Sequence, residues 1–256
     1  MTSQIKFYKN VLSDFIPDKK KSILVCGAGV SDAKVFLDLQ YTNVTMSGMD
    51  FTEGNTGDYT LVCENAESLS FADNSFDFCV MHASIHHTSL PHKVISELYR
   101  VSSQGVVFVE SRDSFLIRLT QRLYLTEEYE VKGTYPGMGV NGTEFPNYIF
   151  RWTEREVMKT IKCFEPRYSH EFKFKYGSNF PDGKNSKRSI RLLLKFMYPL
   201  FKLFTAVFPK QQNLFAVFIK KQHDPERLKP WLKWDINERR IKVDRDYILN
   251  TYSKWY

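Results

Sequence analysis

The stretch ILVCGAGVSDAKVF, residues 23–36, decides the fold, because it reads as a buried strand, a two-glycine turn and the start of a helix. A strand that passes through glycines into a helix brings bare backbone close to a nucleotide. The third glycine of G-x-G-x-x-G is missing, since Asp32 stands three residues after Gly29. Two positions before the first glycine stands Val25, which carries no carboxylate. The stretch therefore predicts a nucleotide-binding turn without deciding which nucleotide binds.

Strand-like and helical patterns alternate through the first half of the chain. Apolar runs predict strands over residues 23–26, 44–50, 59–63, 76–82 and 106–110. Helical spacing occurs between them, over residues 32–39 and 91–101. Such alternation predicts an α/β doubly wound architecture, in which helices cover both faces of a mostly parallel sheet.

Two segments interrupt this regularity, residues 111–152 and residues 177–212. The first contains a predicted helix and then a loop, residues 133–150, that holds four glycines and two prolines. Long loops inside compact domains are typical of lids and binding loops. We expect one domain over residues 1–222, with both segments as insertions, and a basic extension over residues 223–256 that packs on it.

Composition places the chain among globular proteins, with 43% hydrophobic and 25% charged residues in 256. No secretory signal and no run of 18 apolar residues occurs. The four cysteines share no C-x-x-C spacing, which favours a reducing compartment and a cytoplasmic location. The net charge of +7 comes from residues 184–256, which hold 17 basic and 6 acidic side chains. That excess indicates either an anionic partner or a solvated lysine-rich surface.

Candidate site residues lie where strands end, because ligands of doubly wound sheets bind beyond the carboxyl ends of the strands. Gly27 and Gly29 follow the first strand, and their lack of Cβ lets a ligand lie flat on the turn. Asp50 ends the second strand, where a carboxylate can accept both hydroxyls of a ribose. The third strand is followed by residues that can bind an adenine edge: Asn65, Ala66 and Glu67. Both NAD(P) and S-adenosylmethionine fit this arrangement.

A longer motif distinguishes the two cofactors. Residues 64–110, ENAESLSFADNSFDFCVMHASIHHTSLPHKVISELYRVSSQGVVFVE, resemble the stretch from third to fifth strand of class I S-adenosylmethionine-dependent methyltransferases. The shared features are an acidic residue, Ala-Glu, D-x-S-F-D, an apolar strand, His-His, a helix and a strand that ends in a carboxylate. The resemblance covers residues 20–112 and, more weakly, residues 150–222. It implies a seven-stranded, mostly parallel, Rossmann-like sheet with an antiparallel last strand, and S-adenosylmethionine as cofactor.

The resemblance also implies roles for individual residues. The glycines would pass beneath the methionine part of the cofactor, Asp50 would hold the ribose, and His82 would lie near the amino-acid end. The full expected cofactor set is Gly27, Ala28, Gly29, Asp50, Phe51, Asn65, Ala66, Glu67 and His82. Two positions depart from the family, because Asn65 replaces the usual Asp and Val25 replaces the acidic residue that orients the methionine amine.

The His-His pair offers candidates for a catalytic base. His86 or His87 either caps the following backbone or takes a proton from the substrate nucleophile, for which an imidazole is suited. Glu110, at the end of the fifth strand, either pairs with Arg112 or polarises His87 or acts as base itself. Some sugar-tailoring natural-product methyltransferases, which this sequence resembles, pair a His-His turn with a carboxylate here. His82 and His86 lie four residues apart without further ligands around them, so no metal site is expected.

Substrate contacts are expected in the loop of residues 133–150, whose aromatic and polar residues suit stacking on a sugar or an aromatic ring. Alternatively, its aromatic residues only pack the loop onto the domain. The expected substrate-binding residues are Arg112, Tyr135, Asn141 and Tyr148. Residues 188–208 are apolar with a narrow basic stripe, and we expect burial there, ahead of a homodimer contact or a helix at a membrane interface.

The sequence thus predicts methyl transfer from S-adenosylmethionine to a hydroxyl, or an amine, of a small molecule or glycan, as in saccharide or natural-product biosynthesis. One alternative is a catalytically silent protein that uses the cofactor fold for binding. Nucleic-acid methylation is another, but no motif of the Asn/Asp-Pro-Pro-Tyr/Phe type follows the fourth strand.

Overall fold

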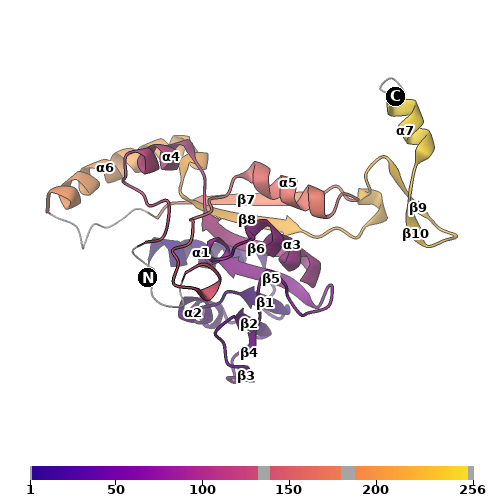
Figure 1. The fold of residues 1–256 in the computed structure, drawn as a ribbon, viewed down its shortest axis with the longest axis horizontal. Helices are drawn as coiled ribbons and strands as arrows, with labels where there is room; N and C mark the ends of the chain where they lie inside the picture. Colours follow the sequence, from indigo (N-terminus) through magenta and orange to yellow (C-terminus); the bar gives the residue numbers. More distant parts are fainter. Residues whose placement is uncertain (1, 132–138, 180–187, 253–256) are drawn as a thin grey trace.

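A central sheet organises the computed structural model, which describes residues 2–131, 139–179 and 188–252. Its strand order is β3-β4-β2-β1-β5-β6-β8-β7 (Figure 1). The strands are β1 (Ile23–Cys26), β2 (Val44–Gly48), β3 (Gly54–Asn55), β4 (Thr60–Cys63), β5 (Phe76–His82), β6 (Ser102–Ser111), β7 (Glu171–Gly177) and β8 (Leu214–Lys220). Seven of them form the predicted sheet, and the two-residue β3 adds an antiparallel edge to β4.

Strand directions confirm the predicted topology. Strands β4, β2, β1, β5 and β6 run parallel to one another, whereas β8 pairs antiparallel with both β6 and β7. The chain leaves β1 toward β2 and β4 and then crosses back to β5 on the other side of β1. The order therefore reverses between β1 and β5, and such a switch point is where doubly wound sheets bind ligands.

Helices cover both faces of the sheet, as expected. The helices are α1 (Ser3–Phe15), α2 (Val30–Asp38), α3 (Pro91–Val101), α4 (Phe115–Arg122), α5 (Glu154–Phe164), α6 (Arg188–Val207) and α7 (Arg245–Tyr252). Buried residues of α1 and α2 form one apolar core with the sheet, and buried residues of α3 and α5 form a second core on the opposite face. Among the described residues, no helix is both long and apolar enough to cross a membrane.

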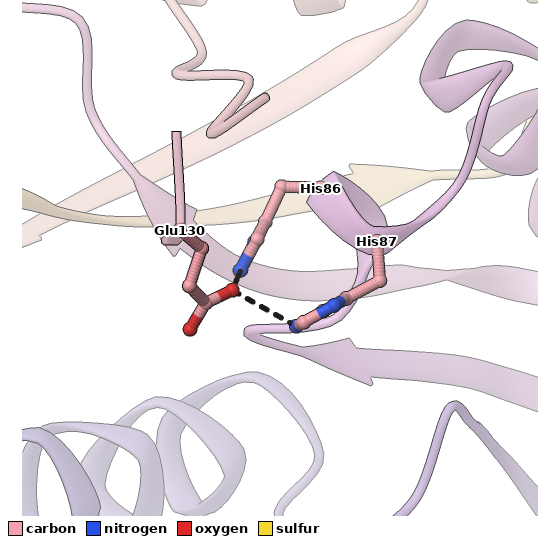
Figure 2. Close-up of side chains that lie close together, drawn as sticks. All are labelled: His86, His87 and Glu130. Carbon is pink, nitrogen blue, oxygen red and sulfur yellow. Dashed lines mark ion pairs between the residues drawn. The ribbon is translucent and has the colours of Figure 1, made fainter. Parts of the chain in front are cut away.

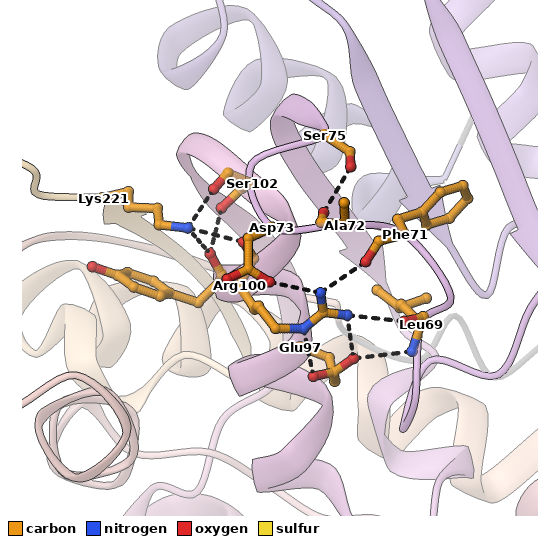
Figure 3. Close-up of polar contacts among 10 residues, drawn as sticks. Leu69, Phe71, Ala72, Asp73, Ser75, Glu97, Arg100, Ser102 and Lys221 are labelled. Carbon is orange, nitrogen blue, oxygen red and sulfur yellow. Dashed lines mark hydrogen bonds and ion pairs between the residues drawn. The ribbon is translucent and has the colours of Figure 1, made fainter.

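Two half-buried cations, Arg100 and Lys221, hold α3 in place at the amino ends of β5 and β6, opposite the edge where β1 meets its glycine turn (Figure 3). Arg100 donates to the carbonyls of Leu69 and Phe71 and pairs with Glu97. Lys221 donates to three carbonyls at the end of α3, and burial lowers its pKa to about 8. Because ammonium donors satisfy the carbonyls that a helix end leaves unpaired, this cluster is structural.

The two insertions and the C-terminal extension differ from the core in their exposure. Helix α4 begins after the N-cap Ser114, whose hydroxyl accepts from the amide of Ile117, and it buries none of its side chains. Helix α6 was expected to be buried, but Phe196 and Leu203 are 69% and 68% exposed, which corrects that expectation. Among the side chains of α6 that the structure describes, Thr205 is buried.

The extension starts with a 3-10 turn, η4 (Pro225–Arg227), and continues into the hairpin β9 (Leu232–Asp235) and β10 (Arg240–Val243). The amide of Ser169 donates to the carbonyl of Arg227, and the amide of Lys229 donates to the carbonyl of Arg167. These bonds join the start of the extension to the domain, while α7 lies beyond the hairpin in Figure 1.

Candidate functional site

A cavity of about 740 Å³ lies at the carboxyl ends of the strands beside the switch point. Nine of the residues expected from the sequence line it: Gly27, Ala28, Gly29, Asp50, Asn65, Ala66, His82, His87 and Asn141. The N-terminal segment adds Thr2, Gln4 and Ile5, so α1 forms one wall. Volumes of this size are typical of sites that hold small molecules and cofactors.

The glycine turn shapes the floor of this cavity. Gly27 has φ +58°, a left-handed conformation that glycine adopts at little cost. A Cβ at this position would lie 2.7 Å from Oγ of Ser84, so the turn also passes too close to its neighbour for a side chain. The amide of Ala28 donates to the carbonyl of Ser47, which ties the turn to the end of β2. A Cβ at Gly29 would meet a single atom within 4 Å, so this glycine leaves the ligand side open.

Asp32 stands where the third glycine is missing, and sequence reasoning did not recognise it as a site residue. Its Oδ2 accepts from the amide of Gly29 at 3.0 Å, which caps the start of α2. Its Oδ1 lies 3.4 Å from Nδ1 of His82 and makes no hydrogen bond within the described part of the chain. The one available signal was its position three residues after the helix N-cap. A buried carboxylate therefore lines the cavity beside the glycine turn.

Val25 does not point toward the ligand side. Its side chain is fully buried in the apolar core that includes residues of α1 and α2. An acid there would have to be desolvated without a partner of its own, which costs far more than burying valine. Beside the glycine turn, a carboxylate is therefore supplied by Asp32 on α2 rather than by β1.

His82 is held by the N-terminal helix. Its ring stacks on Tyr8 with 4.1 Å between ring centroids, and its Nε2 lies 3.4 Å from Nε2 of Gln4. Burial and the neighbouring Asp32 carboxylate raise the pKa of Tyr8. The arrangement keeps His82 at the floor of the cavity, beside Asp32, where the resemblance placed the amino-acid end of the cofactor.

Of the expected cofactor residues that follow β2 and β4, some line the cavity and others do not. Asp50 lines the cavity after β2, and Asn65 lines it after β4 while its Oδ1 accepts from the amide of Glu67 at 2.9 Å. Glu67 itself is buried, and its Oε1 accepts from the amide of Leu90. Phe51 packs against the apolar core and the turn at Gly48 rather than lining the cavity. Neither Glu67 nor Phe51 lines the cavity in this structure, so their expected contacts with the cofactor stay predictions.

His86 and Glu110 form a buried pair beneath the cavity. Nδ1 of His86 lies 2.7 Å from Oε2 of Glu110, and Oε1 of Glu110 accepts from the amide of Ile85. Burial lowers the pKa of His86, but Glu110 and then Glu130 outweigh it and raise that pKa to about 10. For Glu110, burial raises the pKa, but the charge of His86 outweighs burial. The pKa of Glu110 therefore lies below its ordinary value. At neutral pH the pair is therefore imidazolium and carboxylate.

The carboxylate of Glu130 lies beside both His86 and His87 (Figure 2). Nε2 of His87 is 3.5 Å from Oε2 of Glu130, and Nε2 of His86 is 3.7 Å from the same oxygen. A hydrogen bond to His86, together with the charges of both imidazoles, lowers the pKa of Glu130, although partial burial opposes this. His87 lines the cavity, whereas neither His86 nor Glu110 does. Glu130 was not expected, because no sequence spacing connects it to a histidine pair 43 residues earlier.

The expected substrate residues separate into three groups. Asn141 lines the cavity, and its amide group exchanges hydrogen bonds with Ser89. Arg112 is buried in an ion pair with Glu154 rather than with Glu110 and does not line the cavity, so its expected contact with substrate stays a prediction. Tyr148 packs against Tyr129 and is not among the residues that line the cavity, so its expected contact with substrate also stays a prediction. Tyr135 lies outside the described residues.

Comparisons with known proteins agree with this geometry. Residues 26–109, which run from the end of β1 to β6, match the family described as the methyltransferase domain. The match covers 84 of the 256 residues. It supports S-adenosylmethionine as the cofactor of this protein and methyl transfer as its enzymatic activity. A search of curated protein sequences found no match.

Solved structures share the fold at low sequence identity. A chain of the complex that contains the Haloferax volcanii Trm112 methyltransferase activator is 12% identical, with coverage of 87% of this chain and 91% of that one and a TM-score of 0.52. The PH0226 protein of Pyrococcus horikoshii is 14% identical over 86% and 90% of the two chains, with a TM-score of 0.51. The cyclase SpnF is 12% identical over 86% and 81%, with a TM-score of 0.52. One of these proteins is named as a putative methyltransferase and another as a cyclase, so the fold alone does not identify the reaction.

The residues of the cavity fit this cofactor. S-adenosylmethionine carries no phosphate, and Asp32 occupies the helix start on which a dinucleotide would place its pyrophosphate. Asp50 stands at the carboxyl end of β2, where the ribose of such a cofactor is held. The free oxygen of Asp32 is an acceptor for an ammonium group. Chemistry and position therefore agree for the sulfonium cofactor and disagree for a dinucleotide.

Proposed function

We propose that the protein transfers a methyl group to a hydroxyl, or an amine, of a small molecule or glycan, and that His87 takes the proton from the acceptor. When bound, S-adenosylmethionine supplies an electrophilic methyl group. The observation that carries the proposal is the position of His87, which lines the cavity together with the glycine turn and has a carboxylate, Glu130, 3.5 Å from Nε2. A carboxylate beside an imidazole orients the ring and stabilises its protonated form.

His86 and Glu110 support His87 rather than replace it. With its pKa raised to about 10, His86 is already an imidazolium at neutral pH and cannot accept a proton from the acceptor. Both carboxylate oxygens of Glu110 have partners, Oε2 in the ring of His86 and Oε1 in the amide of Ile85. The imidazolium of His86 lies 3.7 Å from Glu130 and so holds that carboxylate near His87. Of the three residues expected to be catalytic, His87 is the one in contact with the cavity.

The remaining cavity residues suit a hydroxylated acceptor. Ser84, Thr88 and Asn141 line the cavity on the same side as His87 and offer hydroxyl and amide groups. A few convergent polar groups of this kind fix the orientation of a ligand in a site. Alignment of the acceptor with the methyl group is itself a large contribution to such a reaction. We therefore favour a sugar or another polyhydroxylated small molecule as the acceptor class.

The test is a comparison of His87→Ala with the wild type. Radioactive methyl transfer from S-adenosylmethionine would be measured against a panel of nucleotide sugars, glycosides, phenols and amines. With an acceptor in hand, we expect His87→Ala to lower kcat by about 10²–10⁴-fold. Binding of S-adenosylhomocysteine, measured by calorimetry, should change little. The matched control is His92→Ala on α3, whose ring contacts Thr160 and lies outside the cavity lining. An unchanged kcat in His87→Ala contradicts the assigned role.

A bound cation is a second candidate for the same cluster. The ligand atoms of His86, His87 and Glu130 lie within 4.8 Å of one another, as a divalent metal site requires. The raised pKa of His86 opposes this reading, because its proton would have to leave before a metal binds. Activity that survives dialysis against EDTA favours His87 as the base. Activity that is lost and then restored by one divalent metal favours the cation.

A further inference from the structure

Helix α6 turns an apolar row toward solvent. Five side chains of this row are between 51% and 69% exposed: Leu192, Phe196, Leu200, Leu203 and Val207. At 100° per residue they fall within an arc of about 80°, which is one face of the helix. The buried Thr205 lies two residues after Leu203 and therefore about 160° from it around the helix. The helix thus exposes an apolar face to solvent, unlike an ordinary surface helix.

Helix α4 repeats this pattern. Phe115, Leu119 and Leu123 follow one another at helical spacing and are 64%, 40% and 57% exposed. Both helices are next to the short turn η3 (Pro209–Gln211), since Gln211 accepts from the amide of Leu116 and α6 ends directly before this turn. The two helices also lie in the same part of Figure 1. Exposed apolar rows on two helices that meet the same turn are typical of an interaction site.

Charge distinguishes between the occupants of this surface. Four basic residues of α6 lie within an arc of about 60° that borders the apolar row: Arg188, Arg191, Lys195 and Lys202. Residues 183–222 contain no Asp and no Glu. A lipid surface with anionic headgroups complements an apolar row bordered by basic side chains. In an antiparallel pairing of two α6 helices, by contrast, the two basic stripes would lie against each other without acidic partners.

We propose that α4 and α6 form a docking surface for membranes that contain anionic lipids. The apolar rows enter the boundary between headgroups and acyl chains, and the basic stripe of α6 contacts lipid phosphates. The docking surface lies close to the cavity edge of the sheet, because α4 follows the end of β6 and α6 precedes β8, whose Leu214 pairs with Ser111 at that end. Resting on the proposed function, this places the acceptor at the membrane surface, as in a glycan carried by a lipid.

The test uses the full chain and sucrose-loaded vesicles of phosphatidylcholine with or without phosphatidylglycerol. We expect sedimentation with the anionic vesicles, weaker sedimentation with neutral ones, and release at high salt. Phe196→Glu with Leu203→Glu should lower partitioning at least about tenfold, since each substitution removes a large inserted side chain. The matched control is Ile236→Glu, which changes an 80% exposed apolar residue between β9 and β10. This control should sediment like the wild type.

Three results would overturn the proposal. One is the absence of sedimentation with anionic vesicles, and another is equal loss in the Ile236→Glu control. The third is a dimer that Phe196→Glu with Leu203→Glu dissociates while the wild type ignores vesicles, which would assign the surface to a second copy of the chain. Calorimetry with S-adenosylhomocysteine on the same proteins shows whether the cofactor site is intact. Failure of docking is thereby separated from failure of the methyltransferase proposal, which does not depend on lipid.

Discussion

The Asp32 carboxylate has two distinct environments. Oδ2 caps the start of α2, which ties the side chain to the backbone of Gly29. Oδ1 is buried near His82 and has no hydrogen bond within the described part of the chain. A buried charged oxygen is costly unless a donor satisfies it. The α-ammonium group of a bound methionine moiety would satisfy it, and Asp32 would thus take the role of the acidic residue that is absent at Val25.

Substitution of Asp32 by Asn separates these two roles, because Asn keeps an oxygen for the cap and loses the charge. A hydrogen bond to a charged group contributes about 1.5–3 kcal/mol. We therefore expect Asp32→Asn to weaken the binding of S-adenosylhomocysteine by about 10–100-fold. The control ligand is methylthioadenosine, which lacks the amino-acid part and should bind both proteins alike in calorimetry. Equal weakening of both ligands would show that Asp32 acts through the fold instead.

At the scale of single elements, the turn after β1 requires a glycine at position 27. Gly27→Ala adds a Cβ at φ +58° and 2.7 Å from Oγ of Ser84. The backbone conformation alone costs on the order of 1–3 kcal/mol for a residue other than glycine. We expect a lower melting temperature and weaker binding of S-adenosylhomocysteine, measured by thermal unfolding and calorimetry. Gly54→Ala, where a Cβ meets nothing within 4 Å, is the matched control and should change neither quantity much. Wild-type cofactor binding in Gly27→Ala would contradict the role of this turn.

The elements differ in how far the sequence predicts them. Strands β1 and β5 were predictable because each is a mostly apolar run that ends in residues with a ligand-binding pattern. Glu130 was not, since its contact with His87 depends on how the chain returns after α4 and leaves no periodic signal. Helix α6 was misjudged because apolar residues are usually buried, and the pattern shows which residues share a face without showing what that face meets.

At the scale of the whole molecule, the central sheet is completed by a strand near the C-terminal end of the chain. Strand β8 inserts between β6 and β7, so residues after 213 complete a sheet that begins at residue 23. Residues of α1 line the cavity, and others join the core beneath it. Segments distant in sequence therefore form the site together, and a ligand in the cavity contacts α1 as well as the strand ends. Such an arrangement couples cofactor binding to the stability of the whole domain.

This coupling gives the measurement that separates a working cofactor site from a silent fold. A ligand that binds the native state alone adds about 2.7 kcal/mol of stability at 100 times its Kd. For a chain of this size, we expect S-adenosylhomocysteine at that concentration to raise the Tm by about 5–10 °C. NAD is the control ligand, because the Asp32 carboxylate at the start of α2 repels a pyrophosphate. No shift with S-adenosylhomocysteine would favour a protein that keeps the fold for binding a partner, and a larger shift with NAD would reverse the cofactor assignment.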